Sequence, residues 1–180
     1  MGDGGQLVRV ELRAVRVDLQ SNTPVLLLQE TPGRRTLAIF VGAPEATAIA
    51  YAVQGVEVPR PMTHDLICNV LLALSAELEQ VVVTELVEAT YFAELHLRRG
   101  EEPIVVSCRP SDAVAVALRS GAPIFVSASL MDAEGVELEL DDEDDDDDED
   151  DLGEVPEVAD ELVGQFRAFL DTIDPEDFTS

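Results

Sequence analysis

Two short stretches of the 180-residue chain are near copies of each other: EATAIA at residues 45–50 and DAVAVA at residues 112–117. The same offset of 67 positions aligns apolar segments that precede the two stretches, Leu26 with Ala93 and Leu37–Ile39 with Ile104–Val106. Each half of the chain then reads as three strands followed by a helix. We therefore predict a duplicated β-β-β-α unit with approximate two-fold symmetry. Chance similarity between two alanine-rich helices is the alternative interpretation.

Apolar and polar residues alternate in the segments that precede the repeated stretches. In residues 7–19, Val8, Val10 and Leu12 alternate with arginine and glutamate, which is the pattern of a half-buried strand. Further strands are expected at 24–30, 36–41, 80–86, 90–98, 101–108 and 123–127. Six or seven mostly antiparallel strands with helices packed on them form an α+β domain, which we place at residues 1–134.

Helix signals follow the third strand of each half. Pro44 suits the first position of a helix, and Gly55 suits the position just past its end. Thr63 is expected to cap a second helix that runs to about Leu78. Ser111 is expected to cap a third helix, which glycine then ends at residue 121.

The negative charge of the chain is unevenly distributed. The formal net charge is −27, and every basic residue is an arginine. Residues 1–134 carry ten arginines against 17 acids, whereas residues 135–180 carry Arg167 alone against 21 acids. Residues 141–151 are all acidic, and such a run cannot fold alone because like charges repel and nothing apolar is available for burial. We therefore expect an acidic, disordered linker at residues 135–154.

An amphipathic helix is expected after the acidic run, within residues 155–180. Pro156 suits its first turn. Apolar residues mark one face of this helix: Val158, Leu162, Phe166, Phe169 and Ile173. Because a single helix of this length is marginal in water, its apolar face should dock on the body of the protein or on a second chain.

The sequence lacks the motifs of several common classes of protein. It contains no P-loop, GxGxxG, GxSxG or HExxH motif and no basic patch with aromatic residues. No apolar run reaches the roughly 20 residues that cross a membrane, and the N-terminus lacks the layout of a signal peptide. Cys68 and Cys108 have no metal-ligand spacing and are expected to be buried thiols. We therefore predict a cytoplasmic protein that contacts no membrane.

The sequence RPSD at residues 109–112 is the first candidate site. Ser111 and Asp112 suit the start of a helix, which explains them without any function. A helix start flanked by Arg109 also has the form of a phosphate site, since its N–H groups and dipole attract anions. Glu45 is the repeat counterpart of Asp112. The two carboxylates could therefore face a shared axis and hold Mg²⁺ or Mn²⁺ for phosphodiester cleavage.

The sequence RPMTHDL at residues 60–66 is the second candidate site. Asp65 lies in the first turn of the expected helix, where a carboxylate complements the helix dipole. Successive helical residues point about 100° apart, so His64 and Asp65 need not touch each other. A neutral imidazole at a helix start could act as a general base on water or a sugar hydroxyl, or it could have no role beyond packing. The other histidine, His96, is expected at the surface of a strand.

Four motifs, taken in their order and spacing, resemble the bifunctional nuclease (BFN) domain family: PVLLLQE, GAPEATAIA, RPMTHDL and SCRPSDAVAVALRSGAPIFVS. The resemblance covers about residues 7–134, and the ending FRAFLDTIDPEDF is similar to the tail of bacterial, actinobacterial-type members. It implies a compact α+β nuclease that acts on DNA and RNA and associates into homodimers. The polar motif positions become site candidates, with Glu45, His64, Asp65 and Asp112 as catalytic residues and Arg60, Arg109 and Ser111 as phosphate-binding residues.

Two functions of different class remain open. The first is a nuclease assisted by Mg²⁺ or Mn²⁺. Its affinity for nucleic acid is expected to be weak, because phosphate contacts supply most non-specific binding and the body of the protein is not basic. The second is a non-catalytic regulatory or assembly module, a small dimer whose acidic tail binds basic partners. A cleavage assay on single-stranded DNA and RNA, with and without the metal ions, separates the two.

Overall fold

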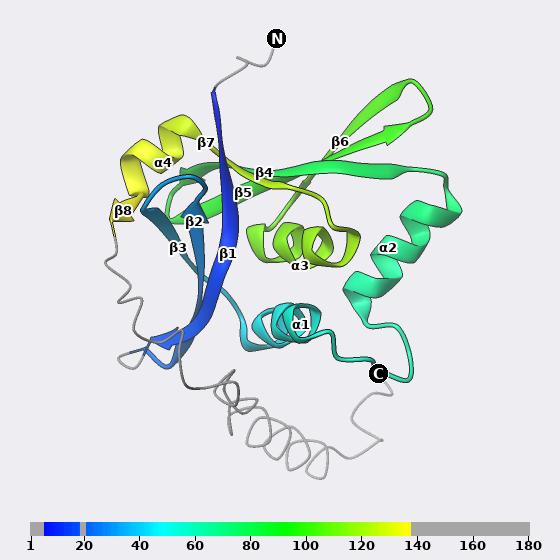
Figure 1. The fold of residues 1–180 in the computed structure, drawn as a ribbon, viewed down its shortest axis with the longest axis horizontal. Helices are drawn as coiled ribbons and strands as arrows, with labels where there is room; N and C mark the ends of the chain where they lie inside the picture. Colours follow the sequence, from blue (N-terminus) through cyan, green and yellow to red (C-terminus); the bar gives the residue numbers. More distant parts are fainter. Residues whose placement is uncertain (1–5, 19–20, 138–180) are drawn as a thin grey trace, which may run out of the picture. The chain divides into compact units, whose positions relative to one another are not determined.

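Eight strands form one sheet within residues 6–18 and 21–137, the part of the chain that the computed structural model describes, in the order β6-β5-β4-β7-β1-β2-β3-β8 (Figure 1). The strands are β1 (Leu7–Asp18), β2 (Thr23–Glu30), β3 (Arg35–Phe40), β4 (Glu77–Val87), β5 (Thr90–Arg99), β6 (Glu102–Cys108), β7 (Ile124–Ser127) and β8 (Val136–Glu137). The helices are α1 (Ala43–Gln54), α2 (Thr63–Ala73), α3 (Pro110–Ser120) and α4 (Ala128–Glu134). This mixture confirms the predicted α+β class.

The two halves of the chain lie on either side of a shared central strand. β1, β2, β3 and α1 recur as β4, β5, β6 and α3 at the predicted offset. β7 lies between β1 and β4, antiparallel to β1 and parallel to β4, so β1 and β4 run in opposite directions. Every other strand pairing in the described part of the chain is antiparallel. This is the strand arrangement that an approximate two-fold axis through β7 would give.

Apolar side chains from the sheet pack against α1 and α3, which also contact each other. Val10 of β1 is only 1% exposed, as its alternating pattern predicts, and residues 113–117 of α3 are all buried. Small side chains at Ala48 and Ala115 let the two helices approach closely. Arg119 can therefore donate to the backbone carbonyls of both residues, at 3.0 and 2.9 Å. The two repeated stretches thus meet in the core of the domain.

Two helix caps differ from the prediction. Ser111 is not the N-cap of α3, because Arg109 takes that position with an extended backbone at ψ 148°. Proline at residue 110 explains this, since the residue before a proline is pushed out of the helical region. Thr63 is not the N-cap of α2 either, because Met62 is extended and Thr63 is already helical. The N–H of Met62 donates to the Asp65 carboxylate at 2.8 Å, so Asp65 performs the capping.

α2 also ends earlier than predicted. The last helical residue is Ala73, and Ser75 adopts the left-handed conformation with φ 54°. Leu78, which was expected in this helix, is buried in β4 instead. The apolar side chains on the outer side of α2 and just after it stay exposed: Leu66, Val70, Leu72 and Leu74.

Apart from residues 135–137, the predictions for the C-terminal part concern residues outside the described ranges. They comprise the acidic linker at 135–154 and the amphipathic helix at 155–180. Within the described part, Val136 and Glu137 pair with Thr36 and Arg35 of β3 as β8. No helix among the described residues is long and apolar enough to cross a membrane.

Candidate active site

The first turns of three helices surround a hollow of about 220 Å³, which we call the His64 hollow. It is lined by Pro44, Glu45 and Ala48 of α1, Met62, Thr63 and His64 at the start of α2, and Arg109 and Asp112 at the start of α3. The start of a helix presents unpaired N–H groups and the positive end of its dipole. Three such starts around one hollow favour the binding of an anion such as phosphate.

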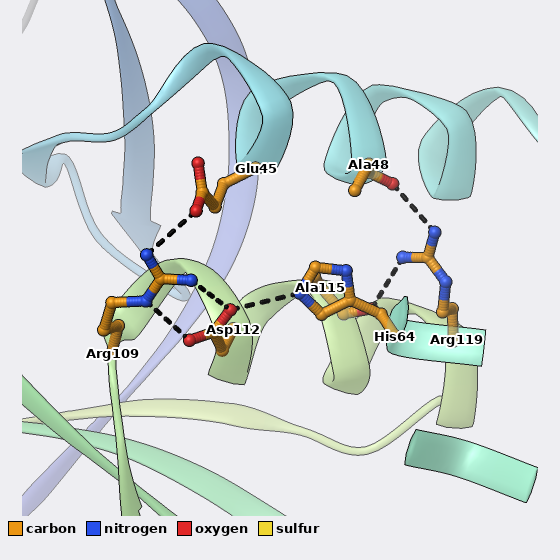
Figure 2. Close-up of polar contacts among 7 residues, drawn as sticks. All are labelled: Glu45, Ala48, His64, Arg109, Asp112, Ala115 and Arg119. Atoms are coloured by element: carbon orange, nitrogen blue, oxygen red, sulfur yellow. Dashed lines mark hydrogen bonds and ion pairs between the residues drawn. The ribbon is translucent and has the colours of Figure 1, made fainter. Parts of the chain in front are cut away.

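Arg109 joins the two carboxylates that the repeat relates to each other (Figure 2). Its Nη1 lies 2.8 Å from Oε1 of Glu45. Its Nε and Nη2 donate to the two carboxylate oxygens of Asp112, at 2.8 and 3.0 Å. Glu45 and Asp112 therefore share one guanidinium. The Arg109 side chain is 64% exposed, so solvent and ligands can reach this cation.

His64 contacts Asp112 rather than its sequence neighbour Asp65 (Figure 2). The imidazole Nε2 lies 3.2 Å from Oδ1 of Asp112, and the residue is buried, with 7% of its surface exposed. The other ring nitrogen, Nδ1, is buried and has no hydrogen-bond partner in the described part of the chain. A carboxylate accepts hydrogen bonds, so we place the proton of a neutral ring on Nε2. Nδ1 then carries the free lone pair.

The surroundings keep Asp112 ionised. Burial acts to raise the pKa of Asp112, but hydrogen bonds from Arg109 and His64 outweigh it, so the pKa lies below its ordinary value. The hollow contains two carboxylates, those of Glu45 and Asp112, and one guanidinium, that of Arg109. The side chains alone therefore leave the hollow slightly negative, which opposes tight phosphate binding.

A model of the bifunctional nuclease domain matches residues 26–139, more than half of the chain. The chain belongs to the bifunctional nuclease domain family. It is 43% identical over 171 residues to an uncharacterized protein of Mycobacterium tuberculosis, an alignment that covers 94% of this chain and 96% of that protein.

Two further relatives of this bifunctional nuclease family member carry nuclease names. Bifunctional nuclease 2 of Arabidopsis thaliana is 30% identical over 145 residues, and Bifunctional nuclease 1 of Oryza sativa subsp. indica is 25% identical over 144 residues. Each alignment covers 77% of this chain and 44% of the relative. The chain therefore spans less than half the length of these two proteins.

The carboxylates of this family member do not fit a protein-bound Mg²⁺ or Mn²⁺ in the arrangement seen. Among the described residues, no group of three His, Cys, Asp or Glu side chains is placed to hold a metal ion. Glu45 and Asp112 are the nearest to such a group, and both already bind the cationic guanidinium of Arg109. We therefore derive no catalytic step through a metal held by these residues.

Three of the predicted site residues lie outside the lining of the His64 hollow. Asp65 binds the N–H of Met62 and forms an ion pair with Arg119, so it supports the start of α2. Arg60 is exposed on the segment between α1 and α2, and Ser111 is buried in the first turn of α3. These three residues are near the hollow in sequence, but their side chains do not line it.

Arg119 is the site-supporting residue that the sequence motifs do not reveal. Its side chain is 11% exposed and forms an ion pair with the Asp65 carboxylate. It also donates to the carbonyls of Ala48 and Ala115 (Figure 2). A basic residue in the last turn of a helix is ordinary, because it complements the dipole there. The only available signal is the spacing from Ala115, which puts both residues on the face of α3 that meets α1.

The remaining histidine and the cysteines lie apart from the hollow. His96 is on β5, where its Nε2 lies 3.0 Å from Oε2 of Glu94, and it is partly exposed as expected. Cys68 and Cys108 are free thiols, but both are only partly buried, so the prediction of buried thiols is wrong in degree. Burial raises the pKa of Cys108 to about 11, which keeps this thiol protonated and unreactive.

Proposed function

We propose that the chain hydrolyses phosphodiester bonds of DNA or RNA and that the reaction takes place in the His64 hollow. The contact between His64 and Asp112, beside the exposed cation of Arg109, is the observation that carries the proposal. A base, a carboxylate that orients it and a cation for the phosphate are groups that phosphodiester hydrolysis needs. Membership of the family and the names of the two plant relatives support the same reaction.

His64 is proposed to act as the general base. Asp112 accepts a hydrogen bond from Nε2–H and holds the ring in one orientation, which leaves the lone pair on Nδ1. The proposal requires a water molecule to reach this buried nitrogen and give it a proton. The resulting hydroxide attacks phosphorus, the phosphorus–oxygen bond to the leaving group breaks, and the leaving oxygen takes a proton from solvent. The ionised state of Asp112 stabilises the imidazolium that forms.

Arg109 is proposed to hold the phosphate. Its exposed guanidinium lies among three helix starts, and arginine suits phosphate because its N–H groups form a planar fork. An incoming phosphate would have to displace one of the carboxylates that Arg109 binds. Glu45 is the candidate for displacement, because it makes a single contact through Nη1, whereas Asp112 makes two. This exchange predicts weak binding of nucleic acid.

We also propose that a divalent ion takes part in the reaction by binding the phosphate of the substrate, rather than by binding to protein side chains alone. Mg²⁺ usually keeps several waters and binds phosphates together with one or two carboxylates. Cleavage is therefore to be measured with Mg²⁺, with Mn²⁺ and with a chelator, separately from the mutational tests.

The test is cleavage of labelled single-stranded DNA and RNA by the parent chain and by three variants purified identically. Asp112→Asn and His64→Gln should lose activity, and His96→Gln should keep it. His96 is a suitable control because it forms a similar histidine–carboxylate contact, with Glu94, outside the hollow. Full activity in both hollow variants would show that cleavage comes from another site or from a contaminating nuclease.

We also propose that the chain forms homodimers in the cytoplasm. Leu66, Val70 and Leu72 are exposed on α2, and between Thr63 and Ala76 the only Asp, Glu, Lys or Arg residue is Asp65. In a chain of net charge −27, an uncharged apolar surface is the part that a second copy can approach without repulsion. The two free cysteines agree with a reducing compartment. A dimer without nuclease activity would support the alternative of a non-catalytic assembly module.

A further inference from the structure

A second hollow lies beside the His64 hollow and has a different chemical character. It also measures about 220 Å³, and we call it the Tyr51 hollow. It is lined by Tyr51 and Ala52 from the second half of α1, by Gly55 just past its end, and by Val56, Val58 and Met62 from the segment that follows. Asp65 and Arg119 complete the lining.

The two hollows are neighbours along α1. Met62 lines both of them. Residues 44, 45 and 48 of α1 line the His64 hollow, and residues 51, 52 and 55 at its end line the Tyr51 hollow. The two sets are about seven positions apart, which corresponds to roughly 10 Å at the rise of an α-helix. A ligand of nucleotide size can therefore reach from one hollow into the other past Met62.

The walls of the Tyr51 hollow suit an aromatic ring rather than a second phosphate. Tyr51, Val56, Val58 and Met62 offer aromatic and apolar surface, on which a nucleobase can stack. The guanidinium of Arg119 is already bound by the Asp65 carboxylate and by two backbone carbonyls, so it offers little to an anion. Its volume equals that of about seven waters at roughly 30 Å³ each, which is room for one base.

We propose that the Tyr51 hollow binds the nucleobase of the nucleotide whose phosphate lies in the His64 hollow. The inference rests on the proposed function, because it requires a nucleic-acid phosphate beside His64 and Arg109. It assigns an aromatic anchor, Tyr51, to a site whose charged residues by themselves bind phosphate weakly. A base bound in this hollow cannot pair with a second strand, so the proposal predicts that the chain binds single-stranded nucleic acid.

The test compares two single-stranded oligonucleotides that differ at one position, where one carries a base and the other an abasic residue with the same backbone. For the full-length chain we would measure two quantities: the rate of cleavage beside that position, and the affinity for each oligonucleotide by fluorescence anisotropy. The base should improve affinity several-fold and should act on KM more than on kcat. Equal affinity for the two oligonucleotides would overturn the inference. Because anisotropy needs no cleavage, this result is separate from failure of the proposed nuclease activity.

Variants at Tyr51 identify the hollow. Tyr51→Leu keeps an apolar side chain but removes the ring, so it should abolish the difference between the two oligonucleotides, whereas Tyr51→Phe should retain it. Tyr91→Leu is the matched control, because Tyr91 lies on β5 outside both hollows. Thermal unfolding of each variant confirms that the comparison is made on folded protein. A preference for the base that persists in Tyr51→Leu would place the base elsewhere and contradict the assignment.

Discussion

Arg119 and Asp65 form an ion pair across 54 positions of sequence, and this pair ties the start of α2 to α3. The same guanidinium binds the carbonyl of Ala48 on α1 and that of Ala115 on α3. His64 directly precedes Asp65. The ion pair therefore also fixes where the imidazole of His64 meets Asp112.

Loss of Arg119 should destabilise the domain. Arg119→Gln leaves Asp65 and two backbone carbonyls without their donor, and we expect the free energy of unfolding to fall by about 2 kcal/mol. Arg119→Lys should recover only part of this, since an ammonium cannot bind all three acceptors in the same way. Urea denaturation measures both. Arg98→Gln, which breaks the exposed pair with Glu79, is the control and should change little; an equal loss there would remove the special role of Arg119.

Stability should fall in acid through Asp65. Hydrogen bonding from Arg119, and then from the Met62 N–H, lowers the pKa of Asp65 below its ordinary value of 3.8. A carboxyl whose pKa is lower in the folded state stabilises the fold above its unfolded pKa and loses this effect as pH falls through the folded pKa. The free energy of unfolding, measured from pH 7 to pH 3, should therefore drop below about pH 4. Asp65→Asn should be less stable at pH 7 and should show a shallower fall; parallel curves would contradict this prediction.

His64 and Asp112 should act as one unit in catalysis. Asp112→Asn is expected to lower the rate of phosphodiester cleavage by about a hundredfold, the size often seen when one polar catalytic group is removed. The double variant His64→Gln with Asp112→Asn should be little worse than the more damaging single variant, because groups that act together are strongly non-additive. Single-turnover cleavage rates complete this cycle. Additive losses would mean that the two residues work independently.

The acidic run at residues 141–151 should compete with nucleic acid for the body of the protein. A tethered polyanion resembles a phosphate chain and has a local concentration of about millimolar, while the proposed phosphate contact of Arg109 is expected to be weak. Replacing the run with Gly and Ser should tighten nucleic-acid binding at low salt, and the gain should fade as salt shortens the screening length to about 8 Å. Equal affinity of the parent and the replaced chain at low salt would leave solubility as the function of the run.

The face of α2 should hold the proposed homodimer together. Leu72 is 78% exposed and lies in the last turn of this helix. Leu72→Asp should shift the mass found by light scattering from dimer to monomer, because the interface would have to bury a charge. Leu7→Asp on β1 is the control at another exposed leucine. A mass that is the same for the parent and Leu72→Asp would exclude α2 from the interface.

The fold was largely predictable because its signals are local or periodic. Alternation around Val10 and the repeat at residues 45–50 and 112–117 correctly predict strands, helices and their duplication. The caps were mispredicted by one or two positions, since the proline at residue 110 moves the cap from Ser111 to Arg109. Such shifts depend on backbone angles that residue preferences alone do not determine.

The site was predictable as a set of residues but not as a set of contacts. The motifs name His64, Asp112, Arg109 and Glu45, and the structure gathers all four around one hollow. The partner of His64 is 48 positions away, so only the packing of α2 on α3 determines that it is Asp112 and not Asp65. Arg119 was not predicted because Asp65 is 54 positions away and its other two partners are backbone carbonyls, which carry no sequence signal.

Glu45 and Asp112 bind the same guanidinium, so the two halves of the repeat contribute different residues to one candidate site. The position that corresponds to Arg109 in the first half is Gly42, and the one that corresponds to Arg119 is Ala52, so neither arginine has a twin. Each half contributes an acid, but only the second contributes Arg109, the cation that joins them. A single inherited change in either half therefore alters the same centre, and the internal symmetry provides no spare copy to compensate for it.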